Sequence, residues 1–293
     1  MTSQTSLRYY ARVMQHFLST RAFEVLALQA SPILGILLSG FSPGTCGVVG
    51  PGLLLLGSVA LTAHVFVFND WAGHVCDLRD TRRVTLVFER RGLGSRHVAQ
   101  VAVALLLLAN VAFAVIGIRA ILLGAGITVL SLLYSGSQSF GKSTPIAASF
   151  NHLLGGTLHF LLGYTVCHAL DSRGVLISLF FGLVFAAGHL NQEVRDYEID
   201  LLNEIRTSAV VFGCRRTFLA SMYIFTAAYA VLFTLAAVGI LPRLLLWSVA
   251  AWLLHVLWSV QALRRGLRFE TAIWMQRRYR LLFAFIGIAM LIR

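Results

Sequence analysis

The chain has 293 residues, of which 58% are hydrophobic and only 12% are charged. A chain this poor in polar residues cannot cover a water-soluble globule, so its solvent is predicted to be lipid. The formal net charge of +12 would suggest nucleic-acid binding in a soluble protein. Here the excess arginine is expected to set orientation in the membrane and to contact membrane lipids, and no nucleic-acid partner is predicted.

Apolar runs long enough to cross a hydrocarbon core as α-helices recur along the sequence. They do not alternate as the strands of a membrane β-barrel do, so the predicted fold is all-α, a polytopic transmembrane helical bundle. Residues 1–293 are expected to form a single domain. About nine helices are predicted, and eight is the alternative count because the last run is short. The predicted helices are centred near residues 23–40, 50–69, 98–117, 119–134, 148–168, 174–192, 217–239, 243–262 and 280–292.

The N-terminal segment 1–21 is predicted to be an amphipathic helix on the inner membrane face. Apolar residues such as Val13 and Phe17 recur there at helical spacing between arginines. Counted loop by loop, 20 of the 24 basic residues fall on one side of the predicted bundle. The positive-inside rule makes that side cytoplasmic. We therefore expect a multi-pass integral membrane protein with a cytoplasmic N-terminus.

The four cysteines show neither a CxxC spacing nor a zinc-type pattern with histidine. Cys46 and Cys167 both fall near the predicted outer face and could pair, although ordinary buried thiols are the expected state. The sequence thus predicts neither a zinc site nor a redox pair.

Acidic residues are concentrated in two short segments, which hold nine of the 12 in the chain. Each segment begins where an apolar helix reaches its predicted cytoplasmic end, so the two are expected to lie at the same depth and to meet. The first holds Asp70, Asp77, Asp80 and Glu89, and the second holds Glu193, Asp196, Glu198, Asp200 and Glu204.

The spacing within each segment places several carboxylates on one helical face. Like charges stacked at the membrane boundary are unfavourable unless a cation offsets them. Mg²⁺ prefers carboxylate and amide oxygens and is commonly shared with substrate phosphates, so two facing clusters suggest a bound diphosphate. The alternative is that these are solvated loop acids paired with nearby arginines. That alternative is less favoured because Asn69 and Asn191 open the two clusters on helices that are still apolar.

The residues around these acids resemble the motifs of the UbiA superfamily of intramembrane prenyltransferases. The segment 69–77 resembles the first family motif, NDxxDxxxD, and the segment 195–200 followed by Arg206-Thr207 resembles the second. Tyr134-Ser135 together with Lys142 resembles a further family feature. The resemblance implies Mg²⁺-dependent transfer of a prenyl group from a prenyl diphosphate donor to an aromatic or lipid-like acceptor at the membrane.

The resemblance also implies roles for individual residues, on the cytoplasmic side. Four aspartates are expected to be catalytic, and with Asn69 they are the expected Mg²⁺ ligands: Asp70, Asp77, Asp196 and Asp200. Asp80 and Glu193 are further possible ligands. The diphosphate is expected to contact Asn69, Lys142, Arg195 and Arg206.

One departure from the family pattern is Gly73, which stands where the first motif usually has its middle aspartate. Asp80 and His74 are the candidate replacements. His152 and His159 lie on one face of a predicted helix and are expected to hydrogen-bond to another helix, with binding of the acceptor as the alternative. His189 lies closer to the second motif.

Two other functions stay open at this level. The same metal site would serve a terpene cyclase of the UbiA type that acts on a prenyl diphosphate. In a different class, a transporter is disfavoured because it is expected to place its charges near the middle of the membrane on broken helices. A non-catalytic binding protein stays open because Gly73 replaces an acid of the first motif.

Overall fold

The computed structural model describes residues 3–77, 87–136 and 141–292, and statements on side chains exclude residues 3–7, 45, 76 and 77. All regular structure in this part of the chain is helical. The long helices are α1 (Ser3–Leu28), α2 (Ala30–Leu38), α4 (Val49–Asp77), α5 (Ser95–Ile116), α6 (Ile118–Gly136), α7 (Ala147–Tyr164), α8 (Ser172–Leu202), α10 (Cys214–Ala237), α11 (Ser248–Arg265) and α12 (Phe269–Ala289). The short ones are α3 (Pro43–Cys46), α9 (Ser208–Phe212) and the 3₁₀ helices η2 (Phe88–Arg91) and η3 (Arg243–Trp247).

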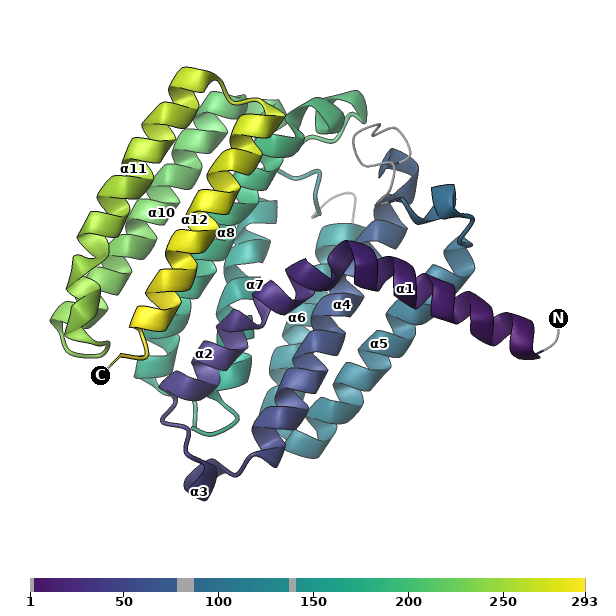
Figure 1. Ribbon diagram of the computed structural model, residues 1–293, viewed down its shortest axis with the longest axis horizontal. Helices are drawn as coiled ribbons and strands as arrows, with labels where there is room; N and C mark the ends of the chain where they lie inside the picture. The colour runs from purple at the N-terminus through teal and green to yellow at the C-terminus, as the bar shows by residue number, and fades with distance from the viewer. Residues whose placement is uncertain (1–2, 78–86, 137–140, 293) are drawn as a thin grey trace.

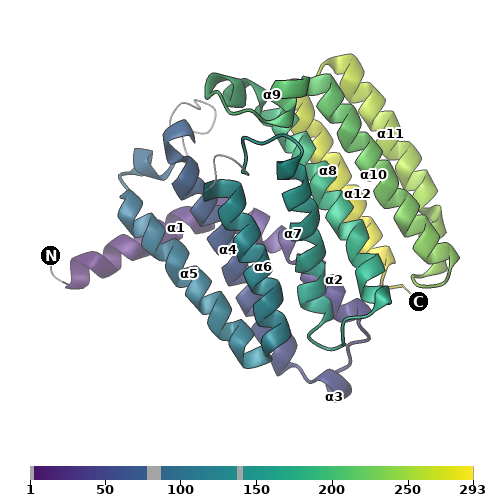
Figure 2. The same cartoon turned by 180° about the vertical axis from the view of Figure 1, so that it is seen from behind.

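The long helices pack side by side into one bundle (Figure 1). One end of the bundle, which we call the motif face, holds the C-terminal ends of α4 and α8 together with α9 (Figures 1 and 2). The opposite end, the distal face, holds α3 and the connection from α7 to α8. The two helices that carry the acidic motifs therefore end on the same face, as the sequence predicts.

Seven helical stretches in the described residues are long and apolar enough to cross a membrane. They are Arg8–Leu38, Val49–Val75, Ser95–Ile116, Ile118–Gly136, Ser172–Leu202, Cys214–Ala237 and Arg243–Arg265. Helix α7 packs against α8 and α2, and α12 packs against α8 and α11, although neither meets the same threshold. The predicted all-α membrane bundle is confirmed, whereas the count of nine crossings stays a prediction.

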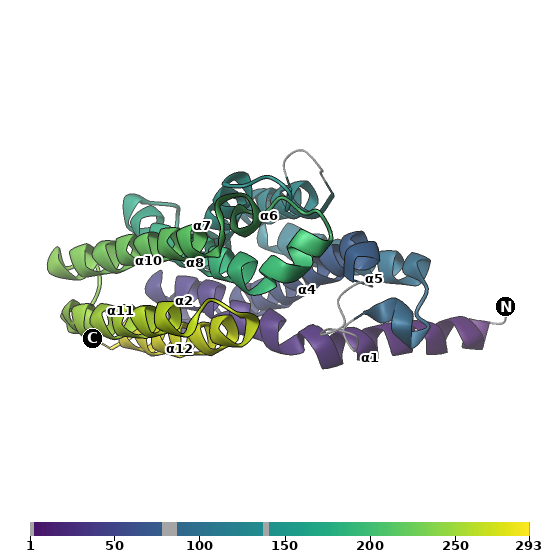
Figure 3. The same ribbon diagram turned by 90° about the horizontal axis from the view of Figure 1, so that it is seen from above.

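The first predicted span is two helices, α1 and α2, that break at Gln29. Pro32 lies in the first turn of α2, where its missing N–H is tolerated but the preceding helix cannot continue unchanged. The buried Gln29 amide fills the break by donating to the Val25 carbonyl and to Thr62 Oγ1, each at 2.9 Å. Helix α1 runs unbroken through Arg21 and lies across α4 and α5, with its N-terminal end projecting beyond the bundle (Figures 1 and 3).

Helices α2 and α7 pack with their backbones in direct contact. A methyl group added at Gly163 would lie 2.0 Å from the Pro32 carbonyl oxygen, and one at Gly35 would lie 2.4 Å from the carbonyl oxygen of Phe160. Small residues allow membrane helices to approach this closely. In lipid the hydrophobic effect does not drive helices together, so the van der Waals contacts of this close approach stabilise the pair. Helix α7 is also joined to α4, because His159 Nε2 lies 2.9 Å from Ser58 Oγ.

A disulfide joins Cys46 of α3 to Cys167 after α7, so the expectation that both would be unpaired thiols was wrong. Their Cα atoms are 5.4 Å apart although 121 residues separate them in sequence. The close packing of α2 against α7 brings the two connections together at the distal face, a tertiary effect that cysteine spacing alone does not reveal.

The last helix also differs from the prediction, because α12 begins at Phe269 rather than near residue 280. Its arginines are accommodated by aromatic contacts, since the Arg278 guanidinium carbon lies 3.8 Å from the centroid of the Trp274 ring. Tyr279 of this helix is buried in the bundle, since it is only 4% exposed and its ring lies 5.1 Å from that of Phe225.

Candidate functional site

The first acidic motif lies in the last turns of α4, where Asp70 is 5% exposed. Its carboxylate is held by Arg21 of α1, which donates through Nε to Oδ2 at 2.8 Å and through its terminal nitrogen to Oδ1. A charge-assisted pair of two parallel hydrogen bonds is the strongest form of arginine–carboxylate contact. A buried carboxylate requires such a partner, so α1 contributes to the first motif the cation that Asp70 needs.

Helix α6 connects the first motif to the second. Ser135 Oγ donates to Asn69 Oδ1 at 3.2 Å, which joins the end of α6 to the end of α4. The neighbouring Tyr134 lies within electrostatic range of the acidic groups of α8, including Asp196 and Asp200. Ser135 thus contacts the first motif, and the ring of Tyr134 contacts His189 of α8 with centroids 5.7 Å apart.

The second motif occupies the last three turns of α8. Asp200 is 2% exposed and lies 3.5 Å from Lys142 Nζ. Asp196 receives two hydrogen bonds from the adjacent Arg195, at 2.9 Å from Nε and 2.7 Å from the terminal nitrogen. Arg195 also donates to Gln276 Oε1 of α12 at 3.2 Å. Both aspartates are therefore paired with basic residues that the sequence analysis assigns to the diphosphate.

Other predicted residues stand apart from these contacts or lie outside the described part of the chain. The side chain of Asp77 and the whole of Asp80 are outside it. Arg206 is exposed in the turn after α8, and no ion pair within the described residues involves it. His74, a candidate replacement for the acid missing at Gly73, places its Nε2 3.5 Å from Glu89 Oε1.

A group of buried polar side chains lies one turn deeper than the second motif. His189 Nε2 is 3.0 Å from Glu193 Oε1, and both residues are 4% exposed. The His189 ring stacks on that of His152 with centroids 3.8 Å apart, and Tyr134 contacts both rings edge-on. Glu193, a possible ligand by prediction, thus lies beside a histidine of its own helix.

Comparison with known proteins identifies the family of the chain. The sequence pattern of the UbiA prenyltransferase family matches residues 32–286. The chain belongs to the UbiA prenyltransferase family. No curated relative matches it.

Solved structures show that the UbiA fold extends over nearly the whole chain. A UbiA homolog from Archaeoglobus fulgidus, solved with GPP and Mg²⁺, superposes with a TM-score of 0.71 at 17% identity and covers 97% of this chain and 99% of its own. The same homolog with DMAPP and Mg²⁺ gives a TM-score of 0.68 at 18% identity, covering 92% of this chain and 96% of its own. A structure of digeranylgeranylglyceryl phosphate synthase gives a TM-score of 0.67 at 15% identity and covers 96% of this chain and 98% of its own.

The donor set of this UbiA protein has the chemistry of a Mg²⁺ site. Carboxylates and one amide oxygen gather at the motif face, and these are the ligands that a hard divalent cation prefers. Among the described residues, no three His, Cys, Asp or Glu side chains already converge on one point. Instead Asp70, Asp196 and Asp200 each contact a basic side chain. These carboxylates are oxygen ligands of the kind that Mg²⁺ prefers. Asp77, whose side chain lies outside the described residues, is the fourth aspartate expected to bind the metal.

Two of these partners, Arg21 and Gln276, were not predicted from the sequence. Arg21 was counted only as a topology signal, although an acid on an apolar helix needs a cation and Arg21 is the basic residue closest to the apolar part of its own helix. Nothing in the sequence indicates that Gln276 approaches Arg195, because 81 residues separate them. The contact of His189 with Glu193 was predictable from their spacing of four residues.

Proposed function

We propose that this protein transfers a prenyl group from a prenyl diphosphate to a hydrophobic acceptor at the membrane in a Mg²⁺-dependent reaction. Its membership in the UbiA prenyltransferase family supports the reaction class. The observation that carries the site assignment is the arrangement of two acidic helix ends on one face, with Ser135 bonded to Asn69 of α4 and Tyr134 beside His189 of α8. The structural relatives solved with GPP, DMAPP and Mg²⁺ support the donor class.

The chemistry requires charge stabilisation at the leaving group, because loss of diphosphate leaves a delocalised allylic cation. Asp70, Asp77, Asp196 and Asp200 would hold the metal together with Asn69. Bound Mg²⁺ would polarise the leaving diphosphate. Lys142 and Arg195 would neutralise its oxygens, since both already stand beside the carboxylates of α8.

The rest of the bundle would protect the cation from water. Apolar side chains dominate the helices that surround the motif face, and the isoprenoid tail would lie among them. The acceptor is proposed to be aromatic or lipid-like, because it must reach the donor from the membrane. A cytoplasmic site is supported by the positive-inside count and by the Cys46–Cys167 disulfide at the opposite face, since disulfides form in oxidising compartments.

The test is Mg²⁺-dependent diphosphate release by purified protein in lipid vesicles. Geranyl, farnesyl and geranylgeranyl diphosphate would each be offered with Mg²⁺ or with EDTA and a membrane-lipid extract. We expect release that EDTA abolishes and that Asp196→Asn lowers by roughly a hundredfold, because the substitution removes a carboxylate charge at the reacting group. Product masses would separate transfer to an acceptor from cyclisation of the donor.

Glu270→Gln is the matched control, because it removes one carboxylate charge from an exposed position in the first turn of α12. It should leave release unchanged. If folded wild-type protein releases diphosphate from none of the donors, the proposal fails in favour of a binding protein or a transporter.

A further inference from the structure

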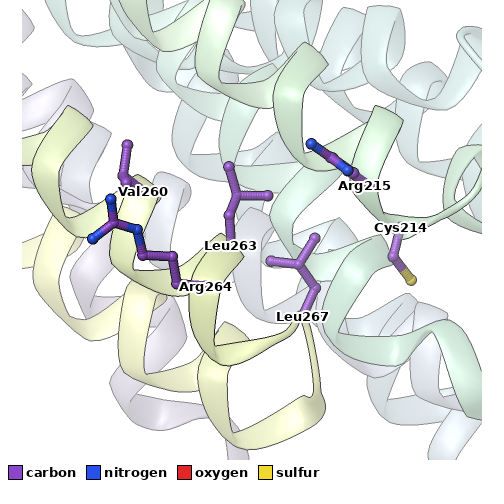
Figure 4. A pocket seen from close by; sticks show the side chains of 6 residues that line it. All are labelled: Cys214, Arg215, Val260, Leu263, Arg264 and Leu267. Atoms are coloured by element: carbon purple, nitrogen blue, oxygen red, sulfur yellow. The ribbon is translucent and has the colours of Figure 1, made fainter.

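A separate cavity of about 510 Å³ opens between the first turn of α10 and the last turn of α11 (Figure 4). Both of these helix ends lie at the motif face (Figures 1 and 2). No residue of either acidic motif lines the cavity. Its lining residues are Cys214, Arg215, Val260, Leu263, Arg264 and Leu267.

The cavity combines positive charge with an apolar wall. Arg215 reaches it from α10 and Arg264 from α11, with Leu263 between them (Figure 4). Both arginines are exposed, and neither takes part in an ion pair within the described residues. No carboxylate lines the cavity. Two guanidinium groups that line one cavity and take part in no ion pair within the described residues give it a charge that suits a phosphate.

The cavity lies at the ends of two candidate membrane spans, Cys214–Ala237 and Arg243–Arg265. Arg265, the residue after Arg264, places its guanidinium carbon 4.8 Å from the Trp274 ring centroid, and Arg278 lies over the same ring. Tryptophan and arginine gather at the boundary between hydrocarbon and water. Val260 and Leu263 precede Arg264 and Arg265 along α11, within the candidate span Arg243–Arg265.

We propose that this cavity binds the phosphate head group of an anionic phospholipid, with Arg215 and Arg264 on the phosphate and the first carbons of the acyl chains against Val260, Leu263 and Leu267. A basic pocket between membrane helices is a recognised setting for anionic head groups. The volume lies in the range of small-ligand sites and suits a head group whose chains continue into the bilayer. A free phosphate would gain nothing from the aliphatic half of the lining.

The test measures lipid retention by the full-length protein released from vesicles of equimolar phosphatidylglycerol and phosphatidylcholine. Native mass spectrometry of the wild type should show one retained phosphatidylglycerol in preference to phosphatidylcholine. The double variant Arg215→Gln, Arg264→Gln should retain about tenfold less phosphatidylglycerol, because both phosphate contacts are gone. Size-exclusion chromatography would verify that the variant is folded.

A control variant, Arg8→Gln with Arg277→Gln, removes the same charge from two exposed arginines outside the cavity and should retain the lipid. Equal retention by the two double variants would overturn the proposal. So would equal binding of phosphatidylglycerol and phosphatidylcholine by the unmodified protein, a measurement that needs no variant. Displacement of the lipid by inorganic phosphate at millimolar concentration would show recognition of phosphate alone, and it too would contradict the proposal.

Discussion

Arg21 is the residue on which the first acidic motif depends most directly. Its side chain is 20% exposed and that of Asp70 is 6% exposed, so the pair lies largely out of water. Arg21→Ala would leave Asp70 as a buried carboxylate without this partner. Breaking a fully buried pair costs about 3–5 kcal/mol, and the partial exposure of Arg21 lowers the expected loss to about 2–3 kcal/mol. Thermal unfolding in detergent should show a melting temperature lower by about 5–10 °C.

The comparison variant is Arg8→Ala, which removes an exposed arginine from the same helix and should change the melting temperature by no more than about 1 °C. Adding Asp70→Asn to Arg21→Ala should recover part of the loss, because the uncompensated charge is then removed. If Arg8→Ala and Arg21→Ala lower the melting temperature equally, the ion pair of Arg21 with Asp70 contributes no specific stability.

The residues whose partners lie nearby in sequence are the ones whose surroundings could be predicted. The placement of Asn69, Asp196 and Asp200 at helix ends follows from hydropathy, and the contact of His189 with Glu193 follows from helical spacing. The partners of Asp70 and Arg195 could not be predicted, because they depend on how α1 and α12 cross the bundle. Gly73 leaves the middle position of the first motif without a carboxylate.

At the scale of elements, the contact between α2 and α7 is the most sensitive to side-chain size. Gly163→Ala adds a methyl group 2.0 Å from the Pro32 carbonyl oxygen, and backbone cannot move aside as a flexible side chain can. We expect destabilisation of about 1–3 kcal/mol. Gly155→Ala lies on the same helix, where an added methyl group meets nothing within 4 Å, and it should be tolerated. The melting temperature of Gly163→Ala should be lower than that of Gly155→Ala. Equal melting temperatures would mean that α2 and α7 are not in backbone contact.

The start of α8 depends on its cap at Asp171, which lies outside the membrane-spanning segments. The Gly174 N–H donates to Asp171 Oδ1 at 2.7 Å, and Tyr164 donates its hydroxyl at 3.0 Å. These contacts favour the carboxylate and lower the pKa of Asp171. The stabilisation is therefore present above the unfolded pKa of about 3.9 and is lost as the pH falls through the lower folded pKa.

The cap therefore predicts a pH-dependent difference between variants. Asp171→Ala should cost about 1 kcal/mol at pH 7. Because protonation weakens the cap in the wild type, the gap between the two melting temperatures should narrow toward pH 3. Asp171→Asn keeps an acceptor oxygen and should show a smaller loss. A gap for Asp171→Ala that stays constant from pH 7 to pH 3 would contradict a role for the charged carboxylate.

Element boundaries were predictable where hydropathy changes abruptly and not elsewhere. The predicted helix near 98–117 matches α5, since glycines flank its apolar run. By contrast α12 begins well before its apolar run, because Arg278 is accommodated by the Trp274 ring. Hydropathy treats such an arginine as the end of a helix, whereas aromatic contacts allow the helix to continue.

For the whole molecule, the class of fold was predictable because hydropathy and charge distribution are properties of the entire chain. The disulfide was not, since it depends on the approach of two connections that are far apart in sequence. The disulfide nevertheless allows the orientation of the protein in the membrane to be measured. Cys46 and Cys167 lie at the distal face, whereas Cys214 lies at the motif face.

Orientation can be measured by labelling cysteines in intact, right-side-out membranes of a Cys76→Ser, Cys214→Ser variant. If the motif face is cytoplasmic, an impermeant maleimide should label nothing until an impermeant reductant opens the disulfide, and should then label Cys46 and Cys167 without lysis. The reason is that both cysteines then face the outside, where disulfides persist. A variant that also carries Cys46→Ser should expose Cys167 to the maleimide without any reductant, which confirms that pairing causes the protection. Labelling that requires lysis would place the acidic motifs on the outer side and would reverse the proposed topology.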